Sequence, residues 1–69
     1  MMIDLYSLLR QREIRPIDLA RRVGVNKSAV ARWAVRRVPA ERVLEVERAT
    51  GIPRHELRPD LYPTEGAAA

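Results

Sequence analysis

Apolar residues recur three and four positions apart along much of the chain, which is the spacing of an α-helix that turns one face to a core. The first such stripe consists of Leu5, Leu8 and Leu9. It predicts a helix from Met2 to about Arg12. No segment alternates apolar and polar residues as a half-buried strand does, and the pattern therefore predicts an all-α fold.

Two short helices separated by a tight turn are predicted next. Pro16 suits the first position of a helix, and Gly24 suits the left-handed residue that ends one, so a second helix is expected over Pro16–Val23. Asn26 is a suitable N-cap for a third helix from Lys27 to about Arg37, its side chain bonded to its own helix backbone. Helices joined by so short a turn cross sharply, which is the helix-turn-helix arrangement.

The second half of the chain predicts a fourth helix. Pro39 suits its first position, and Thr50-Gly51 closes it. Glu45 and Arg48 are spaced for an ion pair on its outer side. Its apolar face is expected to consist of Val43, Leu44, Val46 and Ala49.

A short fifth helix is predicted over Pro53–Leu57, followed by an extended segment from Arg58 to Pro63. Leu61 and Tyr62 of this segment are expected to dock on the core. The sequence therefore predicts five helices in one domain, residues 1–63, with a disordered tail over 64–69.

The third helix has two unlike faces. At about 100° per residue, Val30 and Trp33 share one side, so Trp33 is interpreted as a core residue and not as a base-stacking one. The opposite side carries Ser28, Ala31, Arg32 and Val35. A purely solvated helix face more often carries Glu, Lys and Gln. Short side chains, a forked donor and exposed methyls are instead what a helix in the DNA major groove needs.

The run from Leu19 to Val30 resembles phage Cro-type repressors, and the runs over Val38–Arg42 and Gly51–Pro63 resemble the YdaS group within that class. The resemblance spans about Leu5 to Pro63. It implies a Cro/lambda-repressor-like helix-turn-helix domain that binds DNA and represses transcription in a phage or prophage. It also carries an antitoxin association, with a toxin as partner. The Cro-like pattern often begins its second helix with a polar, phosphate-holding residue, whereas this chain has Pro16.

On this interpretation, five residues are candidates to read bases: Asn26, Lys27, Ser28, Ala31 and Arg32. Arg32 suits guanine O6 and N7, and Ala31, like Val35, suits only a thymine methyl. Lys27 and Ser28 reach either base edges or phosphate. The phosphate-binding candidates are Arg15, Arg21, Arg22, Arg36 and Arg37, although Arg15 is equally explained by the dipole at the end of the first helix.

Charge supports a polyanionic partner. The 69-residue chain has a net charge of +4, but the stretch from Arg10 to Arg37 holds nine basic residues against the two acidic residues Glu13 and Asp18. The positive charge therefore lies on the helix-turn-helix, which favours DNA. The alternative is a solvated, Arg-rich surface, since Lys27 is the single lysine. RNA ranks lower, because no aromatic stacking platform is evident.

Other function classes are disfavoured. The chain has no Cys, one His (His55, interpreted as a surface or capping residue) and no Gly-rich phosphate loop, so neither an enzyme nor a metal or cofactor site is expected. No stretch resembles a signal peptide or a membrane span, and a cytoplasmic, nucleoid-associated protein is expected. The expected partner is double-stranded DNA with a pseudo-palindromic operator, bound by a homodimer that forms at least on DNA. A protein-interaction module that binds a toxin is the alternative.

Overall fold

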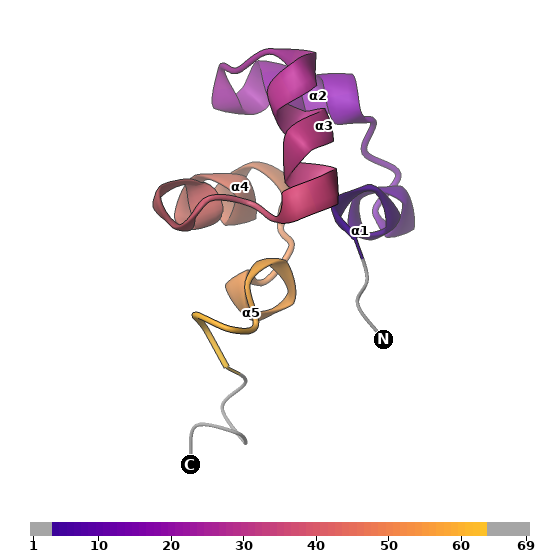
Figure 1. Ribbon diagram of the computed structural model, residues 1–69. Helices are drawn as coiled ribbons and strands as arrows, with labels where there is room; N and C mark the ends of the chain where they lie inside the picture. Colours follow the sequence, from indigo (N-terminus) through magenta and orange to yellow (C-terminus); the bar gives the residue numbers. More distant parts are fainter. Residues whose placement is uncertain (1–3, 64–69) are drawn as a thin grey trace.

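The computed structural model describes residues 4–63 and contains five α-helices and one short 3-10 helix (Figure 1). They are α1 (Leu5–Gln11), α2 (Pro16–Val23), α3 (Lys27–Arg36), η1 (Ala40–Arg42), α4 (Val43–Thr50) and α5 (Arg54–Leu57). No β-strand occurs within residues 4–63. The predicted all-α, five-helix fold is confirmed.

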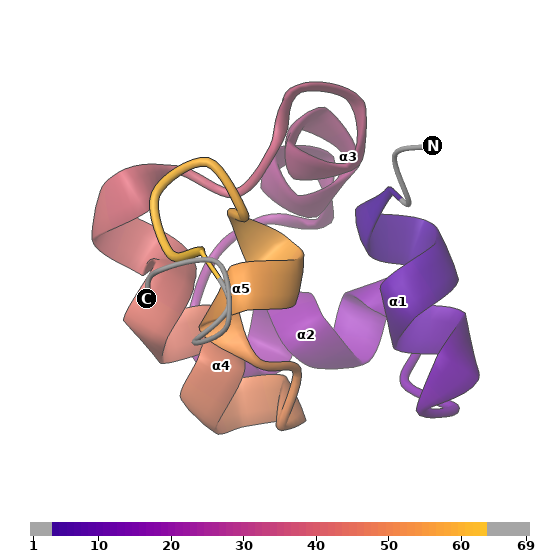
Figure 2. The same cartoon turned by 90° about the horizontal axis from the view of Figure 1, so that it is seen from below.

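A single apolar core joins the helices. α2 packs against both α3 and α4, and α1 packs against α3. α5 lies between α1 and α4, below the crossing of α2 and α3 (Figures 1 and 2). The side chains that are almost fully buried come from every α-helix except α5 and from the loops after α3 and α4: Leu9, Leu19, Val30, Val38, Val43, Val46 and Ile52.

Helix α1 begins later than the apolar pattern predicted. Asp4 caps it, because its Oδ1 accepts a hydrogen bond from the Ser7 backbone N–H at 2.9 Å. Residues 1–3, which include the predicted start at Met2, lie outside the described residues. After the helix, Glu13 adopts a φ of 57°, which is the left-handed conformation usual for the residue that ends a helix.

The helix-turn-helix is formed as predicted, with α2 over the expected residues. Gly24 adopts a φ of 80° at its end, and the small residue Ala20 is buried where the helices meet. Asn26 holds the predicted N-cap position of α3, but its side chain does not make the predicted capping hydrogen bond. Helix α3 stops at Arg36, because Arg37 leaves the helical conformation with a φ of 132°.

Helix α4 begins at Val43 and not at Pro39, because Ala40–Arg42 form a separate 3-10 turn. The predicted apolar face is correct except for Leu44, which is 39% exposed. The predicted Glu45–Arg48 ion pair is wrong. Glu45 pairs instead with Arg42, at 3.1 Å between Nη1 and Oε1.

The segment after α5 turns back on itself, so the predicted extended conformation is wrong. The backbone N–H groups of Leu61 and Tyr62 both donate to the Arg58 carbonyl, at 3.1 and 2.9 Å. Tyr62 packs against the core as expected, whereas Leu61 remains 44% exposed. The predicted disordered tail, residues 64–69, lies outside the described residues.

Candidate nucleic-acid interface

Within the described residues 4–63, no other element covers the outward face of α3. Val30 is fully buried and Trp33 is 8% exposed, so both turn into the core as predicted. Ser28 and Arg32, on the opposite side, are exposed to solvent. The predicted division of this helix into a buried and an outward face is therefore confirmed, and the packing of the domain leaves the outward face free to meet a ligand.

The base-reading candidates lie along this face or at its start. Lys27, Ser28 and Arg32 are exposed, and Ala31 is half-buried between them. Asn26 stands directly before the helix, and its side-chain amide is available because it does not cap α3. The structure brings all five together on one helix and its N-terminal flank.

Four exposed cations on α2 and α3 lack acidic partners. Within residues 4–63, no hydrogen bond or ion pair engages the side chains of Arg21, Lys27, Arg32 or Arg36. Unneutralised positive charge at a protein surface attracts polyanions. These four residues form the cationic set.

The other three phosphate-binding candidates have partners within the chain. Arg15 pairs with Asp18, at 3.0 Å between Nε and Oδ2, and its hydrogen bonds lower the pKa of the Asp18 carboxyl. Arg22 donates from Nη1 to the carbonyl of Ala49 at 2.8 Å. Arg37 forms an ion pair with Asp60 at 3.2 Å. Any phosphate contact by these residues has to use the remaining guanidinium N–H groups.

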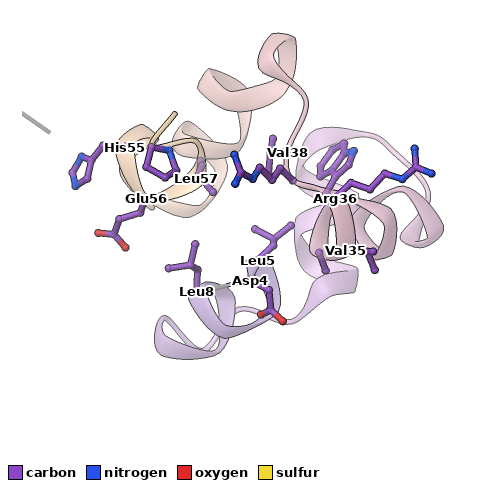
Figure 3. A pocket seen from close by; sticks show the side chains of 13 residues that line it. Asp4, Leu5, Leu8, Val35, Arg36, Val38, His55, Glu56 and Leu57 are labelled. Atoms are coloured by element: carbon purple, nitrogen blue, oxygen red, sulfur yellow. The ribbon is translucent and has the colours of Figure 1, made fainter. Parts of the chain in front are cut away.

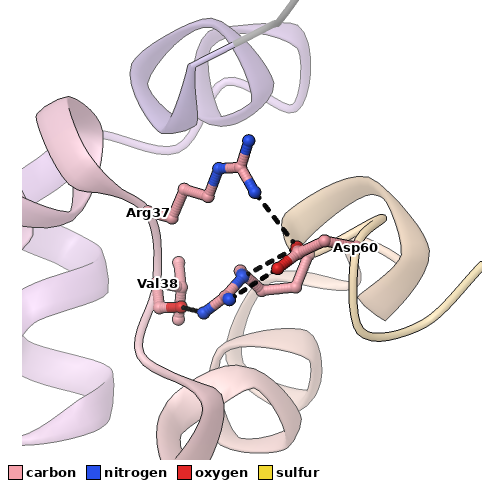
Figure 4. Close-up of polar contacts among 4 residues, drawn as sticks. Arg37, Val38 and Asp60 are labelled. Carbon is pink, nitrogen blue, oxygen red and sulfur yellow. Dashed lines mark hydrogen bonds and ion pairs between the residues drawn. The ribbon is translucent and has the colours of Figure 1, made fainter.

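Three carboxylates of the second half, those of Glu45, Glu47 and Asp60, form ion pairs with arginines of the same half, and Asp60 also pairs with Arg37. The Glu47 carboxylate accepts a hydrogen bond from the Arg54 backbone N–H and forms an ion pair with the Arg54 side chain. Both contacts lower the pKa of Glu47. The Asp60 carboxylate is bonded by Arg58, at 2.7 Å between Nη2 and Oδ2, which lowers the pKa of Asp60 to about 2 (Figure 4). Charge is thus largely balanced around α4 and α5, and positive charge remains on α2 and α3.

The internal contacts of Arg22 and Arg37 were missed by sequence reasoning. Their partners, Ala49 and Asp60, are remote in the chain, and no local spacing indicates such pairs. The Arg58–Asp60 contact does have a local signal, because the two residues are two positions apart. An arginine and an aspartate two positions apart in a turn predict an ion pair of this kind.

A mostly apolar groove opens beside the end of α3. It has a volume of about 440 Å³, and the side chains of Leu5, Leu8 and Leu57 point into the space between α1 and α5 (Figure 3). Val35 and Arg36 of α3 form part of its edge. The outward face of α3 is therefore continuous with this second, apolar surface.

His55 also lines this groove. Among residues 4–63 no three His, Cys, Asp or Glu side chains are grouped so as to hold a metal ion. None of the helices in the described part of the chain is long and apolar enough to cross a membrane.

The fold and the free face of α3 define a small all-α domain of the helix-turn-helix type. Residues 17–65 match the family model described as "Bacterial toxin YdaS", and the chain belongs to this family. The predicted YdaS-type relationship is confirmed. The family is described as a toxin, whereas the sequence resemblance implied an antitoxin, so its description supports a toxin-related role without placing the chain on the antitoxin side. No curated protein and no solved structure matches the chain.

Proposed function

We propose that this protein is a sequence-specific DNA-binding regulator of transcription that inserts α3 into the major groove. The observation that carries the proposal is the uncovered outward face of α3 together with the cationic set. An α-helix with its side chains is about 10–12 Å across, and the major groove is about 12 Å wide, so α3 fits into the groove with its outward side chains at the base edges.

The residues have two kinds of role in this proposal. Arg32 contacts guanine through its two parallel N–H donors, with Lys27, Ser28, Ala31 and Asn26 around it. Arg21 and Arg36 bind phosphates. Further phosphate contacts come from Arg15, Arg22 and Arg37, which keep their partners within the chain and use their remaining N–H groups. No cofactor, metal ion or enzymatic activity is part of the proposal.

One domain contacts few base pairs. Useful specificity therefore calls for two copies on a pseudo-palindrome whose half-sites lie about 34 Å apart. We infer a homodimer on the operator, in the cytoplasm and associated with the nucleoid. A protein bound over a promoter excludes polymerase, so we expect the protein to repress transcription and not to activate it.

Selection of bound fragments from random duplexes, followed by a salt titration of the selected site, tests the proposal. The logarithm of the binding constant should fall linearly with the logarithm of salt concentration, with a slope of about −0.9 per phosphate contacted. Arg21→Ala should make the slope shallower by about 0.9, because one contact is lost.

Arg48→Ala is the matched control. Arg48 is also exposed and, within residues 4–63, also lacks an ion-pair partner, but it lies on α4. The two variants change net charge equally. If both reduce the slope by the same amount, DNA is attracted by net charge and the assignment of phosphate contacts to α2 is wrong.

A protein-interaction module, with or without DNA autoregulation, is the second candidate. The toxin description of the family and the apolar groove favour it. In the form without DNA autoregulation, the chain binds no duplex at low salt. In either form it binds a toxin partner, and Arg32→Ala should leave the affinity for that partner unchanged.

A further inference from the structure

Val35 is unusually exposed for an apolar residue. Its exposed fraction is 87%, against 44% for Leu61 and 39% for Leu44, the other large apolar residues that are exposed within residues 4–63. Although Val35 belongs to the edge of the groove beside α3, the groove walls leave its side chain in solvent. Its methyl groups thus contribute little to the core.

Val35 lies at the centre of the outward face of α3. At about 100° per residue it is about 20° from Ser28 around the helix axis, between Ala31 on one side and Arg32 on the other. Trp33 is about 160° away and turned into the core. A ligand that covers the outward face along the length of α3 therefore reaches Val35 as well as Arg32 and Ser28.

Helix stability gives no reason for a valine at this position. A β-branched side chain loses χ1 freedom in a helix, and Glu, Lys, Gln or Arg is the better choice for a solvated helical residue. Burial gives no reason either, because the side chain is exposed. A ligand that covers the outward face of α3 would explain it.

We propose that Val35 is a base-reading residue that packs on the 5-methyl group of a thymine in the major groove. This inference rests on the proposed function and adds a specificity contact to it. The thymine methyl is the one apolar group that base edges present in this groove. Val35, with two exposed methyls, is suited to this contact, whereas Ala31 has a single methyl and is half-buried.

The spacing places this thymine close to the base pair read by Arg32. Three residues along a helix correspond to about 4.5 Å, and successive base pairs are about 3.4 Å apart. The thymine is thus one or two base pairs from the guanine that Arg32 contacts.

Replacing thymines of the selected site with deoxyuridine, one at a time, tests the inference, because deoxyuridine lacks only the methyl group. At one position the parent protein should lose about fourfold in affinity, which corresponds to about 0.8 kcal/mol for one buried methyl. Val35→Ala should bind the thymine and deoxyuridine duplexes alike. Cytosine and 5-methylcytosine at the same position separate the methyl from the rest of thymine, and the parent should prefer the methylated base.

Leu44→Ala is the control, since Leu44 is an exposed apolar residue of α4, and this variant should keep the parent's preference for thymine. Both variants change exposed side chains, and the melting temperature of each should match the parent. If the preference persists in Val35→Ala, or if no thymine is sensitive, the inference is wrong while the DNA-binding proposal stands. If the chain enriches no duplex, both are wrong.

Discussion

The guanidinium of Arg37 lies 3.2 Å from the carboxylate of Asp60, and this ion pair joins the end of α3 to the turn after α5 (Figure 4). Arg37 adopts a φ of 132° and a ψ of 158°, a conformation that costs a non-glycine residue about 1–3 kcal/mol. Arg58 binds the same carboxylate and donates from Nη1 to the Val38 carbonyl at 2.8 Å. These contacts hold the strained junction at which α3 ends.

Asp60→Asn should reduce the acid sensitivity of folding. The pKa of Asp60 is lowered from 3.8 to about 2 by its hydrogen bonds to Arg58, so its contribution to stability is present above about pH 4 and is lost as pH falls toward 2. The variant should be less stable than the parent at pH 7, and the difference should shrink at pH 2.5. Urea unfolding followed by Trp33 fluorescence measures both.

Asp4, Asp18 and Glu47 also have lowered pKa values, so the parent loses stability in acid for several reasons. The comparison with Asp60→Asn isolates one of them. A difference between variant and parent that is the same at pH 7 and pH 2.5 would show that the Asp60 charge does not stabilise the junction.

Sequence signals predicted a helix correctly where a proline and a glycine mark its ends, or where the apolar period identifies its buried face. Pro16 and Gly24 gave the bounds of α2, and the period of α3 placed Trp33 in the core. The start of α1 was misplaced, because the apolar pattern continues before Asp4 although the Asp4 side chain caps the helix. Capping by an aspartate inside an apolar stretch is easily overlooked.

Glu13→Gly should stabilise the fold. Glu13 occupies the left-handed position after α1, with a φ of 57°, where its N–H donates to the Arg10 carbonyl and the next N–H to the Leu9 carbonyl. An L-residue in this conformation costs about 1–2 kcal/mol, and the greater freedom of unfolded glycine offsets part of the gain, which leaves about 0.5–1 kcal/mol. Urea unfolding measures it.

Glu13→Ala separates backbone conformation from charge, because it removes the carboxylate but keeps a Cβ. It should leave stability close to the parent. A stabilisation as large as that of the glycine variant would attribute the effect to the lost carboxylate beside Arg10 and Arg12.

Trp33→Ala should destabilise the domain by about 3–5 kcal/mol, because it empties a large buried site in a small core. Small domains have little stability to lose, so the variant should be largely unfolded at room temperature. Far-UV circular dichroism measures the lost helix. A variant that stays folded but no longer binds DNA would place the indole on the interface and not in the core.

The residues that make up the candidate site could be predicted from the sequence, but their contacts with the rest of the chain could not. Helical periodicity and charge counting identified the outward face of α3 and the basic half of the chain. They placed Arg21 and Arg22 together on an exposed surface, and both are exposed. Only the folded chain brings the Ala49 carbonyl to Arg22, because the packing of α2 on α4 is a tertiary relationship.

Arg22→Ala should therefore lower stability, whereas Arg21→Ala should not. Arg22 satisfies a carbonyl near the C-terminal end of α4, where a positive charge is also favourable, and its loss should cost about 1 kcal/mol. Arg21 lacks a partner within residues 4–63, and its substitution should stay within about 0.5 kcal/mol of the parent. Thermal melting measures both, and equal melting temperatures would mean that the Arg22 contact does not support the fold.

Arg32→Ala should relax the choice of base at one position of the selected site, whereas a phosphate-binding residue affects all sequences alike. Its two parallel donors distinguish guanine by about 1–3 kcal/mol, and its exposed side chain is free to provide them. Arg32→Lys is the sharper variant, because lysine keeps the charge and loses the fork. It should preserve the salt dependence and lose the base preference, as measured by competition with duplexes substituted at each position. If Arg32→Ala retains the preference, or if Arg32→Ala and Arg21→Ala weaken all duplexes equally, Arg32 is a phosphate anchor, and the reading of bases belongs to other residues of α3.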